Sequence, residues 1–251
     1  MQVPKNIVSK NGYNISATMF LPDDNHIKAI IVACHGFGGD KESSAIYLLA
    51  EKLNQLNIGV LAFDFPAHGE SEVSGERFTV RECIQNIKDV ENYIKNIYGN
   101  IKIGIFSTSF GAYVTLLKIL EEDEFFTVVL RAPAICMDEI LINSILKENI
   151  ADYKSRGFTV LGYEKNMDVY YSFYEELLNN KILDKFNKKR QMLIVQGTED
   201  DMAPISDTIK FLDNNNDAIL EKINGADHRM KKEGELEKAI NIAVDYIMSF
   251  L

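Results

Sequence analysis

The chain has 251 residues, of which 46% are hydrophobic and 25% are charged, and its formal net charge is −10. These proportions are typical of a globular protein and exclude a disordered chain, a collagen-like repeat and a disulfide scaffold. The acidic balance argues against a nucleic-acid partner, because phosphate binding requires a basic surface. No apolar run approaches the ~20 residues that span a bilayer, so we expect no membrane span.

The three cysteines, Cys34, Cys83 and Cys136, are widely and irregularly spaced. They form no Cys-x-x-Cys pair and no Cys/His pattern of a metal site, so we expect no metal. Reduced thiols and a cytoplasmic location are the simplest interpretation. The first ten residues contain no apolar stretch, so we expect no secretory signal.

The first predicted element is a β-hairpin. Residues 3–8 and 13–21 alternate between apolar and polar side chains, and they flank Asn11-Gly12, which is a strong turn signal. We therefore expect the chain to begin with two antiparallel strands.

Further along the chain, short strands alternate with helices. Apart from the last of them, the predicted strands are apolar on both faces, as in parallel sheets that helices cover on both sides. The predicted helices have apolar residues at spacings of three and four. This alternation predicts an α/β fold with a mostly parallel sheet. The strands are expected at 29–33, 58–63, 101–106, 127–130, 192–195 and 218–223, and the helices at 42–56, 79–98, 110–122 and 235–250.

Residues 134–190 interrupt this alternation, because they contain no convincing buried strand. Residues 137–149 and 167–180 have helical periodicity, and the segment is too long for an ordinary connection. We predict a helical lid inserted within a single domain of residues 1–251; the alternative is a longer helical layer. An aromatic stripe in this segment indicates either lid packing, the more usual role, or an aromatic-lined pocket. Its members are Tyr163, Tyr170, Tyr171, Phe173 and Tyr174.

A serine-centred turn follows the predicted strand at 101–106. Residues 107–111 read Ser-Thr-Ser-Phe-Gly, which fits the small-x-Ser-x-Gly pattern of a nucleophile elbow. So sharp a turn needs small neighbours on both sides, and it places the central hydroxyl at a helix N-terminus, where the dipole favours negative charge. Ser109 fits better than Ser107, which would have Ile105 as a neighbour. The alternative is a serine-rich turn without chemistry.

A serine nucleophile needs a base and an orienting acid. His228 follows the last predicted strand, on the sheet edge expected to carry the turn at Ser109; the alternative is a solvated loop histidine. Three acids, Glu199, Asp200 and Asp201, follow the strand at 192–195, and any of them could instead cap a helix or face solvent. We favour Asp200, because the chain order Ser, Asp, His is the expected one.

A glycine-rich loop after the first parallel strand is a candidate oxyanion hole. Residues 35–39 read His-Gly-Phe-Gly-Gly, and the expected donors are the backbone N–H groups of Phe37 and Phe110. We interpret His35 and His68 as structural residues, with a catalytic role as the alternative for His68, and give His26 no role.

These motifs together resemble the α/β-hydrolase family over nearly the whole chain. The matching residues are the loop at 35–38, the segment 64–71, Ser109, the loop at 197–204 and His228. The chain is most similar to small lidded esterases, including the cinnamoyl (feruloyl) esterase and monoacylglycerol lipase-like groups. The resemblance implies a Ser-His-Asp hydrolase with Asp200 as the acid and with no metal or organic cofactor. Ser107 departs from the family pattern, in which glycine is usual.

We therefore predict a carboxylic ester hydrolase that forms an acyl-enzyme with a small-molecule ester. The alternatives are a peptidase, thioesterase or acyltransferase with the same triad, or a binding protein without catalysis. An aminopeptidase would need a buried carboxylate for the substrate amine, for which Asp138, Glu139 and Glu164 are candidates. The oligomeric state is not predicted.

Overall fold

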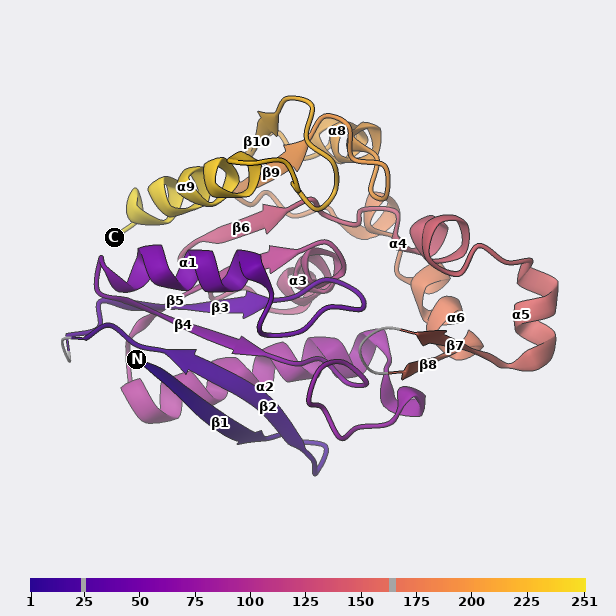
Figure 1. Ribbon diagram of the computed structural model, residues 1–251, viewed down its shortest axis with the longest axis horizontal. Coiled ribbons are helices and arrows are strands. Elements are labelled where there is room, and N and C mark those ends of the chain that lie inside the picture. The colour runs from indigo at the N-terminus through magenta and orange to yellow at the C-terminus, as the bar shows by residue number, and fades with distance from the viewer. Residues whose placement is uncertain (24–25, 163–165) are drawn as a thin grey trace.

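The computed structural model describes residues 1–23, 26–162 and 166–251, and its centre is an eight-stranded sheet (Figure 1). The strand order is β1-β2-β4-β3-β5-β6-β9-β10. β1 and β2 form the predicted hairpin, β2 pairs antiparallel with β4, and every later pair is parallel. The strands are β1 (Gln2–Val8), β2 (Asn14–Phe20), β3 (Ala29–Cys34), β4 (Ile58–Phe63), β5 (Lys102–Thr108), β6 (Val128–Arg131), β9 (Met192–Gly197) and β10 (Ala218–Ile223).

Helices cover both faces of this sheet. β3 shows why, because its successive residues face opposite sides: Ile30 belongs to the hydrophobic core under α2 and α3, and Ile31 belongs to the core under α1 and α9. Both cores are apolar, as the two-faced strand pattern predicted. The covering helices are α1 (Ser44–Asn54), α2 (Val80–Tyr98), α3 (Phe110–Glu121), α8 (Ile205–Asp213) and α9 (Glu235–Met248), of which α8 was not predicted.

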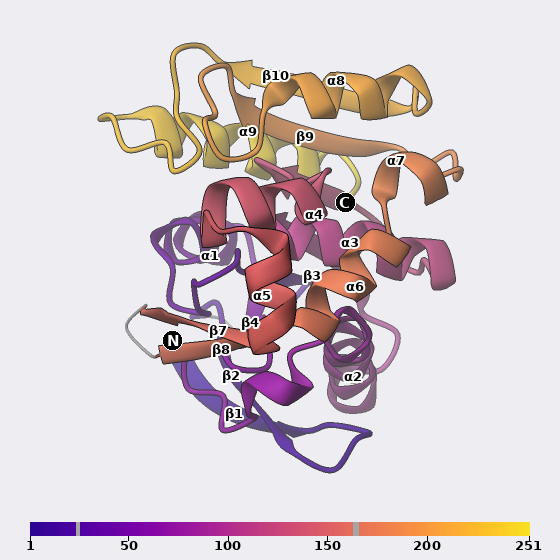
Figure 2. The same cartoon turned by 90° about the vertical axis from the view of Figure 1, so that its right-hand side faces the viewer.

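Between β6 and β9 the chain leaves the sheet and lies over the carboxyl ends of the parallel strands (Figures 1 and 2). The prediction of one helix over residues 167–180 is wrong for its first four residues, which belong to β8. Met167 and Val169 are buried while their neighbours are more exposed, so this stretch has the period of two that a strand requires. The elements are α4 (Met137–Ile140), a π-helical turn (Leu141–Leu146), α5 (Ile150–Arg156), β7 (Phe158–Gly162), β8 (Asn166–Tyr170), α6 (Tyr171–Asn179) and α7 (Ile182–Lys185).

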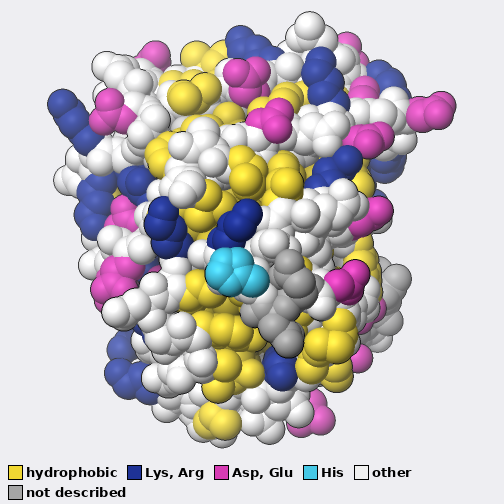
Figure 3. Space-filling view, turned by 90° about the vertical axis from the view of Figure 1, so that its left-hand side faces the viewer, with side chains coloured by type: hydrophobic (Ala, Val, Ile, Leu, Met, Phe, Trp, Pro, Cys, Tyr) yellow, Lys and Arg dark blue, Asp and Glu magenta, His cyan; other side chains and the backbone are white. Residues whose placement is uncertain are grey.

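The opposite face of the molecule carries basic and acidic side chains interspersed with one another and with hydrophobic groups (Figure 3). Within the described ranges, no helix combines the length and the apolar character that crossing a bilayer requires. The polar groups discussed below gather instead at the carboxyl edge of the sheet, under the segment that connects β6 to β9.

Candidate active site

Ser109 occupies a strained turn between β5 and α3. Its φ of 52° and ψ of −113° are uncommon for a residue other than glycine. Close packing explains the glycine at position 111: a Cβ there would come within 2.5 Å of the His35 carbonyl oxygen. The turn therefore depends on a small residue two positions after the serine, as the elbow pattern predicted.

Ser107, the departure from the family pattern, is fully buried in β5. Its Oγ lies 2.7 Å from Oγ1 of Thr115, which is buried in α3. A serine is accommodated because this hydrogen bond satisfies a hydroxyl that burial would otherwise leave unpaired.

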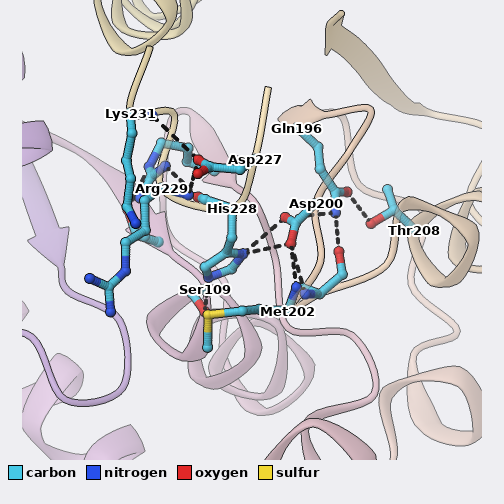
Figure 4. Close-up of polar contacts among 12 residues, drawn as sticks. Ser109, Gln196, Asp200, Met202, Thr208, Asp227, His228, Arg229 and Lys231 are labelled. Atoms are coloured by element: carbon cyan, nitrogen blue, oxygen red, sulfur yellow. Dashed lines mark hydrogen bonds and ion pairs between the residues drawn. The ribbon is translucent and has the colours of Figure 1, made fainter. Parts of the chain in front are cut away.

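The structure brings Ser109, His228 and Asp200 together (Figure 4). Nε2 of His228 lies 3.0 Å from Oγ of Ser109, and its Nδ1 lies 2.9 Å from both carboxylate oxygens of Asp200. Backbone N–H groups of Met202 and Ala203 donate to Asp200 at 3.1 and 2.8 Å, and Nε2 of Gln196 donates at 3.3 Å. The carboxylate is therefore fixed before any substrate arrives.

Among the acids that the sequence left open, Asp200 is the buried one, and it alone contacts His228 in the described part of the chain. Glu199 and Asp201 are both exposed. The backbone donors of the loop converge on the side chain of Asp200, which turns this carboxylate inward.

The two residues expected to form an oxyanion hole flank Ser109. Phe110 is the first residue of α3, so its N–H has no acceptor inside that helix. Phe37 belongs to the loop in which a Cβ at Gly36 would lie 3.2 Å from Cβ of Ser109. Both backbone segments are thus adjacent to the serine, as the proposed role requires.

His35 and His68 hold loops at this edge. Nδ1 of His35 donates to the Gly36 carbonyl at 2.8 Å, and its Nε2 accepts from the Phe65 N–H at 3.1 Å. Nδ1 of His68 donates to the Pro66 carbonyl at 2.8 Å. Burial lowers the pKa of His35 to about 4 and that of His68 to about 3, so both rings are neutral near pH 7.

Arg131, to which the sequence analysis gave no role, lies buried at the end of β6 beside the triad. Its Nη1 donates to the backbone carbonyl of His228 at 3.2 Å, and its Nε donates to Oγ1 of Thr108 at 3.4 Å. Burial lowers the pKa of Arg131 to about 10, which leaves it charged at neutral pH. A charged residue ending an apolar strand was the signal that could have identified it.

A cavity of about 410 Å³ opens at Ser109 and His228. The segment between β6 and β9 contributes the apolar side chains of Met137, Ile140 and Ile145 to its wall. No Asp or Glu lies among the described residues that line it, and no group of three metal-ligating side chains occurs in the described ranges.

Two of the three carboxylates considered for an amine-binding role, Asp138 and Glu139, lie outside this cavity. Asp138 is buried and forms an ion pair with Lys181 at 2.9 Å, and Glu139 is exposed. Glu164, like Tyr163, lies outside the described residues.

The described members of the aromatic stripe pack within the segment and against residues of the rest of the domain. Tyr171 contacts the buried Tyr153 with ring centroids 5.3 Å apart, and Phe173 stacks on Phe78 at 4.4 Å. None of the described members of the stripe lines the cavity at Ser109. The aromatic residues therefore serve as packing, the more usual of the two expected roles.

The sheet order and the strained serine turn at its carboxyl edge define an α/β hydrolase. A family model described as "Serine aminopeptidase, S33" matches residues 25–171, more than half of the chain. The chain belongs to this family. A search of the curated proteins gives no match.

Solved structures support the same fold. The chain is similar to Est1E from Butyrivibrio proteoclasticus bound to ferulic acid, with 22% identity, a TM-score of 0.79 and coverage of 97% of this chain and 100% of that chain. It is also similar to the mouse alpha/beta hydrolase domain-containing protein 10, with 15% identity, a TM-score of 0.78 and coverage of 99% of this chain and 100% of that chain. An esterase from Pyrococcus furiosus has 18% identity and a TM-score of 0.73, with coverage of 99% of this chain and 91% of that chain. At these identities the likeness establishes the fold alone.

Proposed function

We propose that the protein is a serine hydrolase of carboxylic esters, with Ser109 as nucleophile, His228 as general base and Asp200 as the orienting acid. The observation that carries this proposal is the 3.0 Å contact between Ser109 Oγ and His228 Nε2, made by a ring whose other nitrogen is held by a buried carboxylate. A hydroxyl placed in this way can lose its proton as it attacks.

In the acylation step, His228 takes the proton of Ser109 while Oγ bonds to the ester carbonyl carbon. The negative charge that develops on the carbonyl oxygen is stabilised by the N–H groups of Phe37 and Phe110. Asp200 accepts a hydrogen bond from Nδ1, which fixes the tautomer and stabilises the imidazolium. When the tetrahedral intermediate collapses, His228 returns the proton to the departing alcohol.

In the deacylation step, His228 removes a proton from water, and the hydroxide oxygen bonds to the acyl carbon. The carbonyl oxygen again carries negative charge toward the same two N–H groups. Collapse breaks the bond to Ser109, which regains its proton from His228, and the free acid leaves. Every step uses groups of this chain and water.

An aminopeptidase is the second candidate, because the family description names that activity. A substrate amine requires a carboxylate near the nucleophile, and the described wall of the cavity supplies none. Asp138 is already paired with Lys181. Two of the similar solved structures bear the names of esterases or of a bound ferulic acid, which also favours the ester.

We also propose that residues 134–190 act as a lid that sets selectivity. Met137, Ile140 and Ile145 from this segment contribute to the apolar part of the cavity wall. A cover of this kind excludes water and contacts the part of the substrate that differs between esters.

The test of the nucleophile compares two serines of the same turn. Ser109→Ala should lower kcat for a p-nitrophenyl ester by at least ~10³-fold, because the attacking oxygen is lost. Ser107→Ala is the matched control: it removes a buried hydroxyl and should lower stability while activity remains. A fluorophosphonate probe should label the wild type and Ser107→Ala, and should not label Ser109→Ala. Labelling or turnover that survives in Ser109→Ala would rule out the proposed nucleophile.

A matched pair of substrates separates the two candidate activities. An amino-acid p-nitrophenyl ester and the corresponding p-nitroanilide present the same acyl group. We expect the ester to be cleaved and the anilide to resist. Efficient cleavage of the anilide that depends on its free amine would favour the aminopeptidase instead.

A further inference from the structure

The cavity at Ser109 has the opposite charge from the molecule as a whole. The chain has 37 acidic and 27 basic side chains, yet the described wall of this cavity contains two guanidinium groups, Arg131 and Arg229, and no carboxylate. A local sign that opposes the overall charge is best explained by what the cavity binds.

The first guanidinium is buried and has no carboxylate in direct contact, although the charges of Asp200 and Asp227 act on it from a greater distance. Arg131 is 8% exposed, and its hydrogen bonds go to neutral oxygens of Thr108 and His228. No acidic side chain in the described ranges lies within ion-pair distance of it. A buried cation that no carboxylate contacts directly is costly, so an anion that enters the cavity would be stabilised near it.

The second guanidinium belongs to Arg229, directly after His228. Its side chain extends from the His228 loop with no dashed contact at the guanidinium (Figure 4). Arg229 also lines a neighbouring cleft that contains Asp40, Glu42 and Glu70, but no ion pair joins it to these residues in the described structure. Its donors are therefore available to a ligand.

The start of α1 adds to this positive environment. Ser43, Ser44 and Ala45 line the cavity. The helix has 11 residues, no side-chain cap and no acidic residue in its first turn. Its first N–H groups thus carry the positive end of the helix dipole with no capping side chain.

We propose that the esters hydrolysed at this site carry a carboxylate, which Arg229 binds in the positive field of Arg131 and the α1 N-terminus. The planar guanidinium fork of arginine matches a carboxylate and can bind it through two parallel hydrogen bonds. This inference rests on the proposed ester hydrolysis and narrows its substrate class.

The test uses two matched pairs of esters, because the carboxylate can belong to the acid or to the alcohol. The first pair is 4-nitrophenyl hydrogen adipate and the neutral 4-nitrophenyl adipamate. The second is 3-acetoxybenzoate and the neutral 3-acetoxybenzamide. In the wild type, the charged member of at least one pair should have a kcat/KM about 10-fold higher, as expected for a charge-assisted hydrogen bond. Added salt should reduce this preference.

Arg229→Gln should abolish the preference through the KM of the charged ester and leave the neutral ester almost unchanged. Lys231→Gln is the control, since it removes one exposed positive charge from the same loop outside the cavity wall, and it should keep the preference. Equal rates for charged and neutral esters in both wild-type pairs would overturn the inference. So would an Arg229→Gln variant that keeps the preference or slows both esters equally. Ester hydrolysis itself fails only if the neutral esters show no turnover that depends on Ser109.

Discussion

Asp200 differs from its neighbours Glu199 and Asp201 in where its backbone places it. Its carboxylate accepts the N–H groups of Met202 and Ala203, an arrangement in which the side chain folds back over its own loop. The adjacent acids then face solvent. Three consecutive acids looked alike in sequence, because the distinction depends on loop hydrogen bonds that form only in the folded chain.

Replacement of the acid should therefore affect one position of this loop far more than the next. Asp200→Asn should lower kcat by up to ~10⁴-fold, because an amide that donates to Nδ1 of His228 stabilises the wrong tautomer. Asp201→Asn, which removes the same charge one residue later, should change kcat only slightly. The measurement is ester turnover, with circular dichroism to verify folding. A larger loss of kcat in Asp201→Asn than in Asp200→Asn would show that Asp201, and not Asp200, has the orienting role.

Strands whose residues are buried in the structure were predicted from the sequence better than strands whose residues are exposed. The parallel strands other than β10 are buried on both faces and were predicted close to their observed positions. β7 was not predicted: its sequence contains apolar residues, but it has only five residues, which alternate between exposed and half-buried positions. β8 was predicted as part of a helix, because Met167 begins an apolar series that α6 continues. The strand there depends on pairing with β7, which is tertiary information.

Side chains of the proposed lid should divide into cavity residues and packing residues. Ile145→Ala should lower kcat/KM for a bulky ester relative to an acetate by roughly 10-fold, since one apolar contact in a pocket is worth ~1–3 kcal/mol. Tyr171→Ala is the control: it removes a side chain that packs on Tyr153 outside the cavity, so it should lower the thermal midpoint and keep the ratio of rates. An unchanged ratio in Ile145→Ala, with full activity toward both esters, would argue against the selectivity role.

For the whole molecule, the two buried histidines link stability to pH. Their pKa values are lowered by burial from 6.5 to about 4 in His35 and about 3 in His68. Between these values and 6.5 the unfolded chain binds protons that the folded chain does not. The free energy of unfolding therefore rises with pH in this window. The contribution of the two histidines to it is fully present above about pH 6.5 and is lost as the pH falls toward 4.

His68→Asn should weaken this dependence. The asparagine amide can still donate to the Pro66 carbonyl, but it does not titrate. The loss of unfolding free energy between pH 7 and pH 5 should be smaller than in the wild type by about 2 kcal/mol, which urea titrations at the two pH values can measure. His26→Asn, at an exposed histidine, is the control and should keep the wild-type difference. An identical difference in His68→Asn would show that another group carries the dependence.

β6 and β9 are neighbours in the sheet, although the whole segment that covers the cavity lies between them in the chain. Val129 pairs with Leu193, and the N–H of Ala132 donates to the Val195 carbonyl at 2.9 Å. Because the two strands are parallel, the chain leaves the sheet at the carboxyl end of β6 and re-enters it at the amino end of the adjacent strand β9. A different sequence inserted between these two strands would be joined to the sheet at the same two strand ends. The turn at Ser109 and the loops after β9 and β10 lie outside the exchanged stretch. Under the proposed function, an exchange of this segment would therefore alter the cavity wall and leave Ser109, Asp200 and His228 in place.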